Sequence, residues 1–229
     1  MVASRQREKS EASTARTLEA ALELFSSQGF GATSMRQIAD AAELSVGNVY
    51  HHFDSKEAIY ERLLEQYWEN VLDPEMPLNR IFAEAEFPED LEEMASAIEA
   101  VVEGNRRYIL LIYVDVIEFR GEHIRSFYEG MADRFNEAYA DRLRQRQEAG
   151  ELGEAADPLV AVMTATRWFF YFFTVEKCFG VPMHFGMGAD EAVREFSRLL
   201  RYGLLPRDGQ TNNGSKTAAP AAPTNRGET

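Results

Sequence analysis

The side chains of this chain that could do chemistry gather in residues 34–56, and their types suit hydrogen bonding to nucleic acid. Asn48 can pair bidentately with adenine, Gly47 beside it allows a close backbone approach, and Gln37 could reach a base edge. Other groups in the stretch suit phosphate contacts, which position a protein on DNA without reading its sequence. The full set expected to contact double-stranded DNA is Ser34, Arg36, Gln37, Ser45, Gly47, Asn48, Tyr50, His51 and Lys56.

A helix-turn-helix is the arrangement that could present these groups together. Apolar residues at helical spacing predict a first helix over residues 13–28. Ser34 followed by Gln37 is a capping box that opens a second helix, and Ser45 is an N-cap for a third. Val49 should turn inward on the third helix, which leaves the polar side chains outward. In a helix-turn-helix, this last helix enters the DNA major groove.

The same stretch resembles the DNA-binding segment of the TetR/AcrR family of transcriptional regulators. The resemblance rests on residues 33–39 (TSMRQIA), 42–45 (AELS), 47–53 (GNVYHHF) and 55–57 (SKE), within roughly 50 residues that keep many fixed spacings. It implies an all-α fold, in which an N-terminal three-helix DNA-binding domain precedes a larger helical domain for ligand binding and dimerisation. It also implies that the last two long helices form the dimer interface.

Two positions depart from the family pattern. Glu43 occupies the turn position that usually holds glycine, and a positive φ there would cost about 1 kcal/mol. The expected recognition helix, which begins at Ser45, has no lysine or arginine, so base reading falls on Asn48 and on backbone approach at Gly47. Lys56, in the first turn of the following helix, is expected to clamp a phosphate.

The charges are distributed unevenly along the chain. The 229 residues carry a net charge of −14, but residues 1–56 hold six basic and seven acidic side chains. The acidity therefore belongs to the remainder of the chain, which should face away from DNA. Arg5, Arg7 and Lys9 predict a mobile basic arm that adds phosphate or minor-groove contacts. With few cationic contacts, DNA binding should be of moderate strength and strongly salt-dependent.

Three parts are predicted along the chain. Residues 1–54 form the helix-turn-helix domain with its basic arm, residues 55–206 a helical effector-binding and dimerisation domain, and residues 207–229 a disordered tail. Pro74, Pro77 and Pro88 mark a loop near the start of the second domain. The helices expected there cover residues 55–72, 88–103, 106–119, 123–149, 158–179 and 190–205.

Two of these helices predict a homodimer. Residues 168–173 read WFFYFF, and a helix that is aromatic on all sides must be buried on all sides. In so small a domain, one side can meet the core and the other a second subunit. The last helix has an apolar stripe formed by Val193, Phe196, Leu200 and Leu204. Two helices from each subunit would form a four-helix interface, in agreement with the resemblance.

The aromatic and methionine side chains of the second domain predict an effector pocket between helices 106–119, 123–149 and 158–179. Each could equally belong to a plain core. Arg167 lies in the most apolar helix, where an unpaired charge is costly, so it needs an acidic partner such as Asp115 or Glu118, or an anionic group on a ligand. The expected ligand is largely hydrophobic. The candidate lining residues are Tyr108, Ile112, Phe127, Met131, Met163, Arg167, Phe170 and Tyr171.

Several other classes of protein are disfavoured. The motifs of nucleotide-binding, metalloprotease and serine-hydrolase sites are missing from the sequence, which argues against an enzyme and against a cofactor. His51 and His52 are adjacent, about 100° apart on a helix, and cannot chelate one metal. The single cysteine, Cys178, is expected to be a buried small hydrophobe. The polar N-terminus and the lack of a long, clean apolar run predict a cytoplasmic protein without a membrane span.

Two function classes remain open. The first is a ligand-responsive regulator, most consistent with a repressor, that binds a near-palindromic operator as a dimer and is released by a small effector. The second is a DNA-bound protein-interaction regulator with no small-molecule effector. A closed cavity lined by Phe, Tyr and Met would favour the first class, whereas a packed core with an exposed apolar patch would favour the second.

Overall fold

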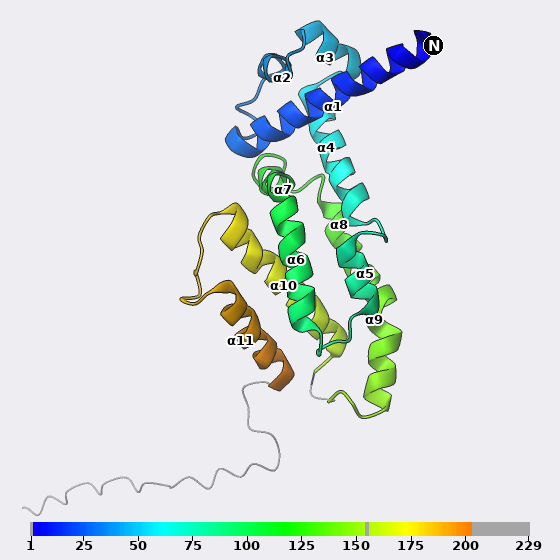
Figure 1. Cartoon of the computed structure of the whole chain (residues 1–229), viewed down its shortest axis with the longest axis vertical. Coiled ribbons are helices and arrows are strands. Elements are labelled where there is room, and N and C mark those ends of the chain that lie inside the picture. Colours follow the sequence, from blue (N-terminus) through cyan, green and yellow to red (C-terminus); the bar gives the residue numbers. More distant parts are fainter. Residues whose placement is uncertain (1, 154–155, 203–229) are drawn as a thin grey trace, which may run out of the picture.

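The structure, a computed structural model, describes residues 2–153 and 156–202, and this part of the chain is helical with no strand (Figure 1). The all-α expectation is therefore confirmed. The expected tail over 207–229 and Leu204 lie outside the described residues. The helices are α1 (Val2–Gln28), α2 (Met35–Ala41), α3 (Val46–His52), α4 (Lys56–Val71), α5 (Pro77–Glu84), α6 (Leu91–Gly104), α7 (Arg106–Glu118), α8 (Arg125–Glu129), α9 (Met131–Glu148), α10 (Pro158–Phe173), a π-helix (Thr174–Cys178) and α11 (Ala189–Tyr202).

Serine side chains fix where the helices of the first domain begin. The capping box at α2 is present, because the Ser34 hydroxyl accepts from the Gln37 N–H at 3.3 Å and the Ser34 N–H donates to Gln37 Oε1 at 2.8 Å. The Ser45 hydroxyl accepts from the Asn48 N–H at 3.1 Å and so begins α3. Ser55 caps α4 in the same way. Each cap satisfies an N–H group that the helix itself leaves unpaired.

The helix-turn-helix packs around one small hydrophobic cluster. α1 crosses α2, α3 and α4, and Phe25, Ile38 and Val49 are fully buried between them. The first half of α4 adds Tyr60 to this cluster, and α7 adds Leu111. The cluster therefore joins the two parts of the chain, and the expected boundary at residues 54–55 stays a prediction.

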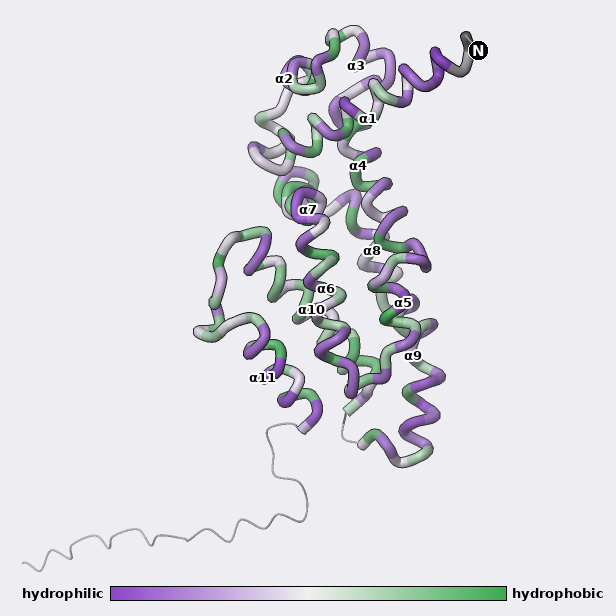
Figure 2. Tube along the Cα trace, in the orientation of Figure 1, coloured by the Kyte–Doolittle hydropathy of each residue, from purple (hydrophilic) through white to green (hydrophobic). Residues whose placement is uncertain are grey.

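The second cluster surrounds α6. Helices α5, α10 and α11 and the π-helix contact α6, and α9 packs on α10. Ile98 of α6 and Phe169, Phe172 and Phe173 of α10 are nearly free of solvent. The N-terminal turns of α1 and the outer helix α9 are mostly hydrophilic (Figure 2). The hydrophobic residues of the second part thus converge on α6 and α10.

Three of the expected element boundaries were wrong. The proline-marked loop contains α5, because Pro77 occupies the first turn of a helix, where its missing N–H is not needed, and Leu78 is buried. The helix expected over 123–149 is two helices, α8 and α9, that meet at Gly130. The first helix begins at Val2 rather than residue 13, so the basic residues expected on a mobile arm lie on α1.

The segment Pro158–Cys178 is long and apolar enough to cross a membrane by length and composition, which corrects the expectation that no run qualifies. Its core side nevertheless packs against α6, with Val162, Ala165 and Phe169 fully buried. A core helix satisfies the same criterion, so its hydropathy is weak evidence for a membrane span.

Candidate nucleic-acid interface and effector region

The outer sides of α2 and α3 lie at the end of the molecule that also holds the N-terminus (Figure 1). Of the side chains expected to contact DNA, Tyr50 is 50% exposed, and Asn48 and Lys56 are partly buried. The recognition helix α3 carries no lysine or arginine. The positions that are exposed to solvent are Ser34, Arg36, Gln37, Ser45, Gly47, Tyr50 and His51.

Gln37 and Asn48, the two residues whose side-chain amides are expected to read bases, differ in whether their amide oxygens already have hydrogen-bond partners within the protein. Gln37 Oε1 accepts from both the N–H and the hydroxyl of Ser34, each at 2.8 Å, so this side chain is turned back onto the cap of α2. The Asn48 carbonyl oxygen Oδ1 is buried and has no hydrogen-bond partner among the described residues. Because an unpaired buried acceptor is costly, Asn48 gains from rotating toward an external donor, and Gln37 does not.

Lys56 does not fit the phosphate clamp expected from the sequence. Its ammonium donates to the carbonyl oxygens of Phe30 at 2.7 Å and Thr33 at 2.8 Å, and it lies 4.0 Å from the centre of the Phe30 ring. Two of its three donors are therefore committed to the α1–α2 loop. The structure assigns Lys56 to holding that loop against the start of α4.

The turn between α2 and α3 has the conformation expected from its sequence position. Glu43 has φ of 54°, in the left-handed region that favours glycine. Its N–H donates to the Asp40 carbonyl, and the Leu44 N–H donates to the Ala39 carbonyl at 2.9 Å. These bonds hold the turn at a cost of about 1–2 kcal/mol for a residue with a Cβ.

Gly47 has no structural reason to be glycine. Its φ is not in the positive range, and an added Cβ would meet nothing within 4 Å. Glycine in a helix interior costs roughly 0.5–1 kcal/mol relative to alanine. A requirement for close approach by an external partner would explain its presence, and the outer side of α3 is where DNA would approach.

A carboxylate from α7 joins the two parts of the chain. The Glu118 side chain accepts from the Phe30 N–H at 2.9 Å through Oε1 and from the Gly31 N–H at 2.6 Å through Oε2. Phe119, the next residue, packs edge-on against Phe30 at 4.7 Å between ring centres and stacks on Tyr60 at 4.9 Å. We refer to these contacts as the Glu118 clasp.

Buried polar groups continue behind the clasp. The Tyr60 hydroxyl donates to the Leu111 carbonyl at 2.7 Å, and burial raises its pKa, so the proton that makes this bond is retained. Asp115 is fully buried and lies 2.6 Å from His123 Nδ1, while the His123 ring packs on Phe119 and Tyr60. A buried carboxylate requires such a partner.

A third contact between the two parts is ionic. Arg107, in the first turn of α7, donates to Glu19 at 2.7 Å and lies 3.5 Å from Glu23. The hydrogen bond to Glu19 raises the pKa of Arg107. α1 is thus attached to the start of α7 by Arg107, and the loop that follows α1 is attached to the end of α7 by the clasp.

The sequence did not indicate these partners. Of the two alternatives for Arg167, the ion pair with Asp115 or Glu118 is not formed, and the contact with an anionic ligand group stays a prediction. Asp115 and Glu118, offered as its ion-pair partners, are used by His123 and by the α1–α2 loop. Arg167 lies on the exposed side of α10, where its guanidinium contacts the Met131 sulfur at 3.4 Å. Its charge is tolerated because it faces solvent.

Two of the expected ligand-lining residues belong to an aromatic stack that the sequence analysis missed. Tyr108 stacks on Tyr67 at 5.4 Å, and Phe127 stacks on Trp68 at 4.1 Å between ring centres. Tyr67 and Trp68 are consecutive near the end of α4. The buried indole N–H of Trp68 has no hydrogen-bond partner among the described residues. The aromatic pair in the sequence was the signal that could have identified them.

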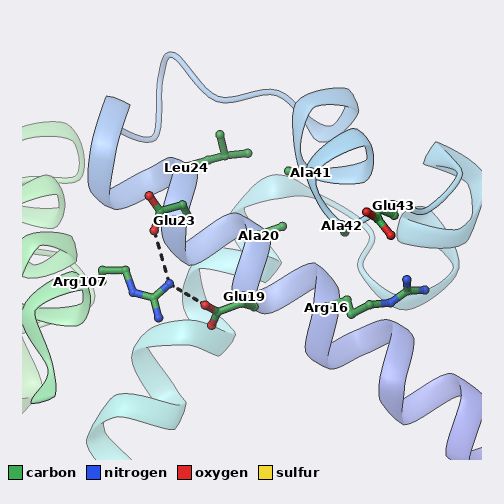
Figure 3. A pocket seen from close by; sticks show the side chains of 9 residues that line it. All are labelled: Arg16, Glu19, Ala20, Glu23, Leu24, Ala41, Ala42, Glu43 and Arg107. Carbon is green, nitrogen blue, oxygen red and sulfur yellow. Dashed lines mark hydrogen bonds and ion pairs between the residues drawn. The ribbon is translucent and has the colours of Figure 1, made fainter.

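The remaining candidates differ in their exposure to solvent. Ile112, Met131, Met163 and Phe170 are partly buried, whereas Tyr171 is 60% exposed on the same side of α10 as Arg167. Hollows in the described part of the chain include the following two. One, of about 390 Å³, lies beside α1 (Figure 3), and the other is near Arg194 and Arg198 of α11; neither includes an expected lining residue.

Known proteins match this arrangement most strongly in the first part. The model of the family "Bacterial regulatory proteins, tetR family" matches residues 18–63. UidR, a transcriptional regulator of Escherichia coli K12, is 29% identical over 138 residues, which cover 60% of this chain and 67% of UidR. The repressor KstR2 of Rhodococcus jostii is 43% identical over 54 residues, covering 24% of this chain and 26% of KstR2.

Solved structures extend the likeness over most of the chain. KstR2 of Mycobacterium tuberculosis, a ketosteroid transcriptional regulator, has a TM-score of 0.58 at 21% identity and covers 82% of this chain and 92% of its own. FadR of Bacillus subtilis, solved with stearoyl-CoA, has a TM-score of 0.58 at 17% identity and covers 83% and 98%. These two show a shared fold. PfmR of Thermus thermophilus is 26% identical, with a TM-score of 0.56 and coverage of 83% and 96%.

The role inferred for Gly47 can be separated from the fold by one substitution. Gly47→Ala should raise the free energy of unfolding by roughly 0.5–1 kcal/mol, because alanine is the better helix residue, and should weaken DNA binding by crowding the interface. Gly104→Ala, at the end of α6 with equally open surroundings, is the matched control. Urea denaturation and electrophoretic mobility shift would measure both effects. Unchanged DNA affinity in Gly47→Ala would contradict the role.

Proposed function

Because the chain belongs to the TetR family of transcriptional regulators, we propose that it is a repressor that binds a near-palindromic operator as a homodimer. A small, largely hydrophobic effector bound in the second domain releases it from DNA. The observation that carries the proposal is the capped helix-turn-helix, whose helix α3 turns Gly47, Tyr50 and His51 toward solvent. We infer a cytoplasmic location and no catalytic role, because the matched relatives are transcriptional regulators.

In this proposal Asn48 reads a base and Arg36 positions the backbone. The unpaired Oδ1 of Asn48 supports the first assignment, since an adenine amino group would supply its missing donor. Arg36 is exposed on α2, where its guanidinium can reach a phosphate. A two-fold dimer would place two α3 helices about 34–36 Å apart, one turn of B-DNA, which doubles the contacts.

The exposed side of α10 supports the dimer. Val160, Thr164, Arg167 and Tyr171 lie along one side of this otherwise buried helix, and Val160 is 57% exposed. The stripe expected on the last helix is used differently. Val193 is buried, Phe196 stacks on Trp168 at 3.9 Å, and Leu200 packs on the core, so these residues hold α11 on its own chain. The proposed interface is therefore centred on the outer side of α10.

The aromatic stack at the end of α4 supports a hydrophobic effector. Tyr67, Trp68, Tyr108 and Phe127 supply apolar surface, and the Trp68 N–H supplies one unpaired donor, a composition typical of small-molecule sites. The similar folds of a ketosteroid regulator and of a regulator solved with stearoyl-CoA point to the same ligand class.

Helix α7 is the proposed connection between effector and DNA. Tyr108 lies near its start, in the aromatic stack, and Glu118 ends it in the clasp on Phe30 and Gly31. A shift of α7 would move the loop that leads into α2 and so change the setting of α3. Release requires that ligand bind the DNA-incompetent state more tightly, with a coupling of about 1–3 kcal/mol.

One observation favours a second candidate function, a DNA-bound regulator that binds another protein and no small molecule. The loop after the π-helix exposes several large apolar side chains. Exposed apolar side chains of this kind mark interaction surfaces. The residues are Phe179, Val181, Met183 and Phe185, each 44–59% exposed.

Asn48→Ala should lose discrimination at one base pair of each half-site, by roughly 1–3 kcal/mol, because the bidentate pair is removed. Arg36→Ala should weaken all sequences alike and serves as the control for phosphate contacts. Binding to a panel of single-base variants of a fragment selected by the wild-type protein would measure both. A panel profile unchanged by Asn48→Ala would place base reading elsewhere on α3.

Val160→Asp should convert the dimer into a monomer. Val160 lies in the first turn of α10, where a carboxylate is favourable for the helix itself, so the isolated subunit should keep its fold. Buried in an apolar interface, the same charge would be strongly unfavourable. Light scattering at micromolar concentration would measure the mass, with Leu72→Asp, an exposed residue at the end of α4, as the control. A monomer mass for the wild-type protein in the same measurement would contradict the proposed dimer.

Effector binding should change the fluorescence of Trp68. The chain has two tryptophans, so Trp168→Phe should keep the response and Trp68→Phe should lose it. A steroid and a long-chain acyl-CoA are suitable first probes, with release of operator DNA measured in parallel. If hydrophobic compounds change neither the fluorescence nor the DNA affinity, the protein-interaction function is the better account.

A further inference from the structure

The ring of Phe127 is held between two side chains from different helices. It stacks on the indole of Trp68 from α4 at 4.1 Å between ring centres, with the two planes 15° apart. The guanidinium carbon of Arg134 from α9 lies over the same ring, 4.6 Å from its centre. At these distances one face of a ring has no room for both groups, so Trp68 and Arg134 lie on opposite faces. We call this arrangement the Phe127 sandwich.

Phe127 belongs to a segment with little other attachment to the protein. No residue of α8 is fully buried, and α8 lies beside the end of α4 (Figure 1). Glycines stand on both sides of this short helix, Gly121 with φ of 75° before it and Gly130 after it. Moving α8 outward would therefore uncover little apolar surface besides the Phe127 ring and the face of Trp68 beneath it.

Arg134 holds Phe127 by its backbone as well as by its ring. The guanidinium donates a hydrogen bond to the Phe127 carbonyl. Gly130 makes room for it: the φ of −82° at this position suits any residue, but an added Cβ would meet Arg134 Nη1 at 2.8 Å. Within residues 2–153 and 156–202, no carboxylate lies within ion-pair distance of Arg134. If Phe127 leaves, this guanidinium is therefore free to pair with an anion from outside the chain.

The other side of the sandwich also has an unused polar group. The indole N–H of Trp68 is buried and has no hydrogen-bond partner among the described residues. A buried donor without a partner is unfavourable, and the hydrocarbon ring of Phe127 offers it no oxygen. A ring that carried an oxygen substituent past the edge of the indole would supply the missing acceptor.

We propose that Phe127 occupies the place of the effector, and that the effector is a planar aromatic acid. Its ring replaces Phe127 between Trp68 and Arg134, and its carboxylate pairs with the guanidinium that Phe127 releases. A saturated chain fills the same space with less gain, because attraction to an indole face and to a cation depends on the charge distribution of an aromatic ring. The inference rests on the proposed function, since it takes the aromatic stack as the effector site.

Phe127→Ala tests this proposal, because it removes the ring that competes with the ligand. The probe is naphthoate, and decanoate is the comparison, an aliphatic acid of similar size; titration calorimetry measures the binding of each. Phe127→Ala should bind naphthoate roughly tenfold more tightly than wild type, since the site is then open in every molecule. Adding Arg134→Met should abolish the gain. Tyr128→Ala is the matched control, because this neighbouring aromatic residue of α8 is 48% exposed.

Three results would overturn the proposal. They are equal affinity for naphthoate in Phe127→Ala and wild type, an equal gain in Tyr128→Ala, and an equal gain for decanoate. The second result would indicate only a loosened α8, and the third only an apolar hole. If circular dichroism shows that Phe127→Ala does not fold, Phe127→Leu takes its place, because leucine fills the space without stacking. The same preference for naphthoate over decanoate is then expected, and its absence overturns the proposal.

Release of operator DNA is measured separately, so that the failure of the sandwich and the failure of the proposed function can be distinguished. If Phe127→Ala gains affinity for naphthoate and no ligand releases DNA, the sandwich is supported and the proposed function is contradicted. If a steroid or an acyl-CoA releases DNA and no variant binds naphthoate, the proposed function is supported and the sandwich is overturned.

Discussion

The α1–α2 loop depends on Phe30, because every group of this residue is held by another element. Its N–H donates to Glu118 of α7, its carbonyl accepts from Lys56 of α4, and its ring lies among Phe25, Tyr60 and Phe119. A buried backbone group left unpaired costs as much as a lost hydrogen bond. The helix-turn-helix therefore cannot change its setting independently of α7 and α4, which both continue into the second part of the chain.

The charged side chains of α1 differ along its length. The acidic side chains where α1 contacts α7 are compensated, and basic side chains lie beyond that contact. Arg107 compensates Glu19 and Glu23 where α1 meets α7, and that ion pair is partly exposed, so it orients the helices more than it stabilises them. Beyond that contact the helix extends into solvent with basic side chains. An acidic protein can thus present a locally cationic end, because its acids are concentrated on the second part and partly paired where they approach the first.

The sequence predicted the features that depend on neighbours within about four residues. Capping serines, apolar spacing and the left-handed position of Glu43 are local, and the structure bears them out. The contacts that were missed join distant residues: Glu118 lies 88 positions from Phe30, and Lys56 lies 26 from it. Nothing in the spacing of a glutamate or a lysine specifies which remote backbone group its side chain will contact. Lys56, whose side chain suits a phosphate contact, instead donates to backbone carbonyl groups of the α1–α2 loop.

Helix α10 connects the two proposed events in the second part of the chain. One side packs against α6 through Phe169 and Phe173, and the opposite side leaves Val160 and Tyr171 in solvent. Closely packed cores rearrange between discrete states rather than deform gradually. If an effector displaces the aromatic side chains between α4, α7 and α8, the α7 shift that follows acts on the π-helix that continues α10, since α7 contacts it directly. The same displacement would then change both the clasp and the outer side of α10. The orientation of each α3 would thereby be coupled to the spacing between two subunits.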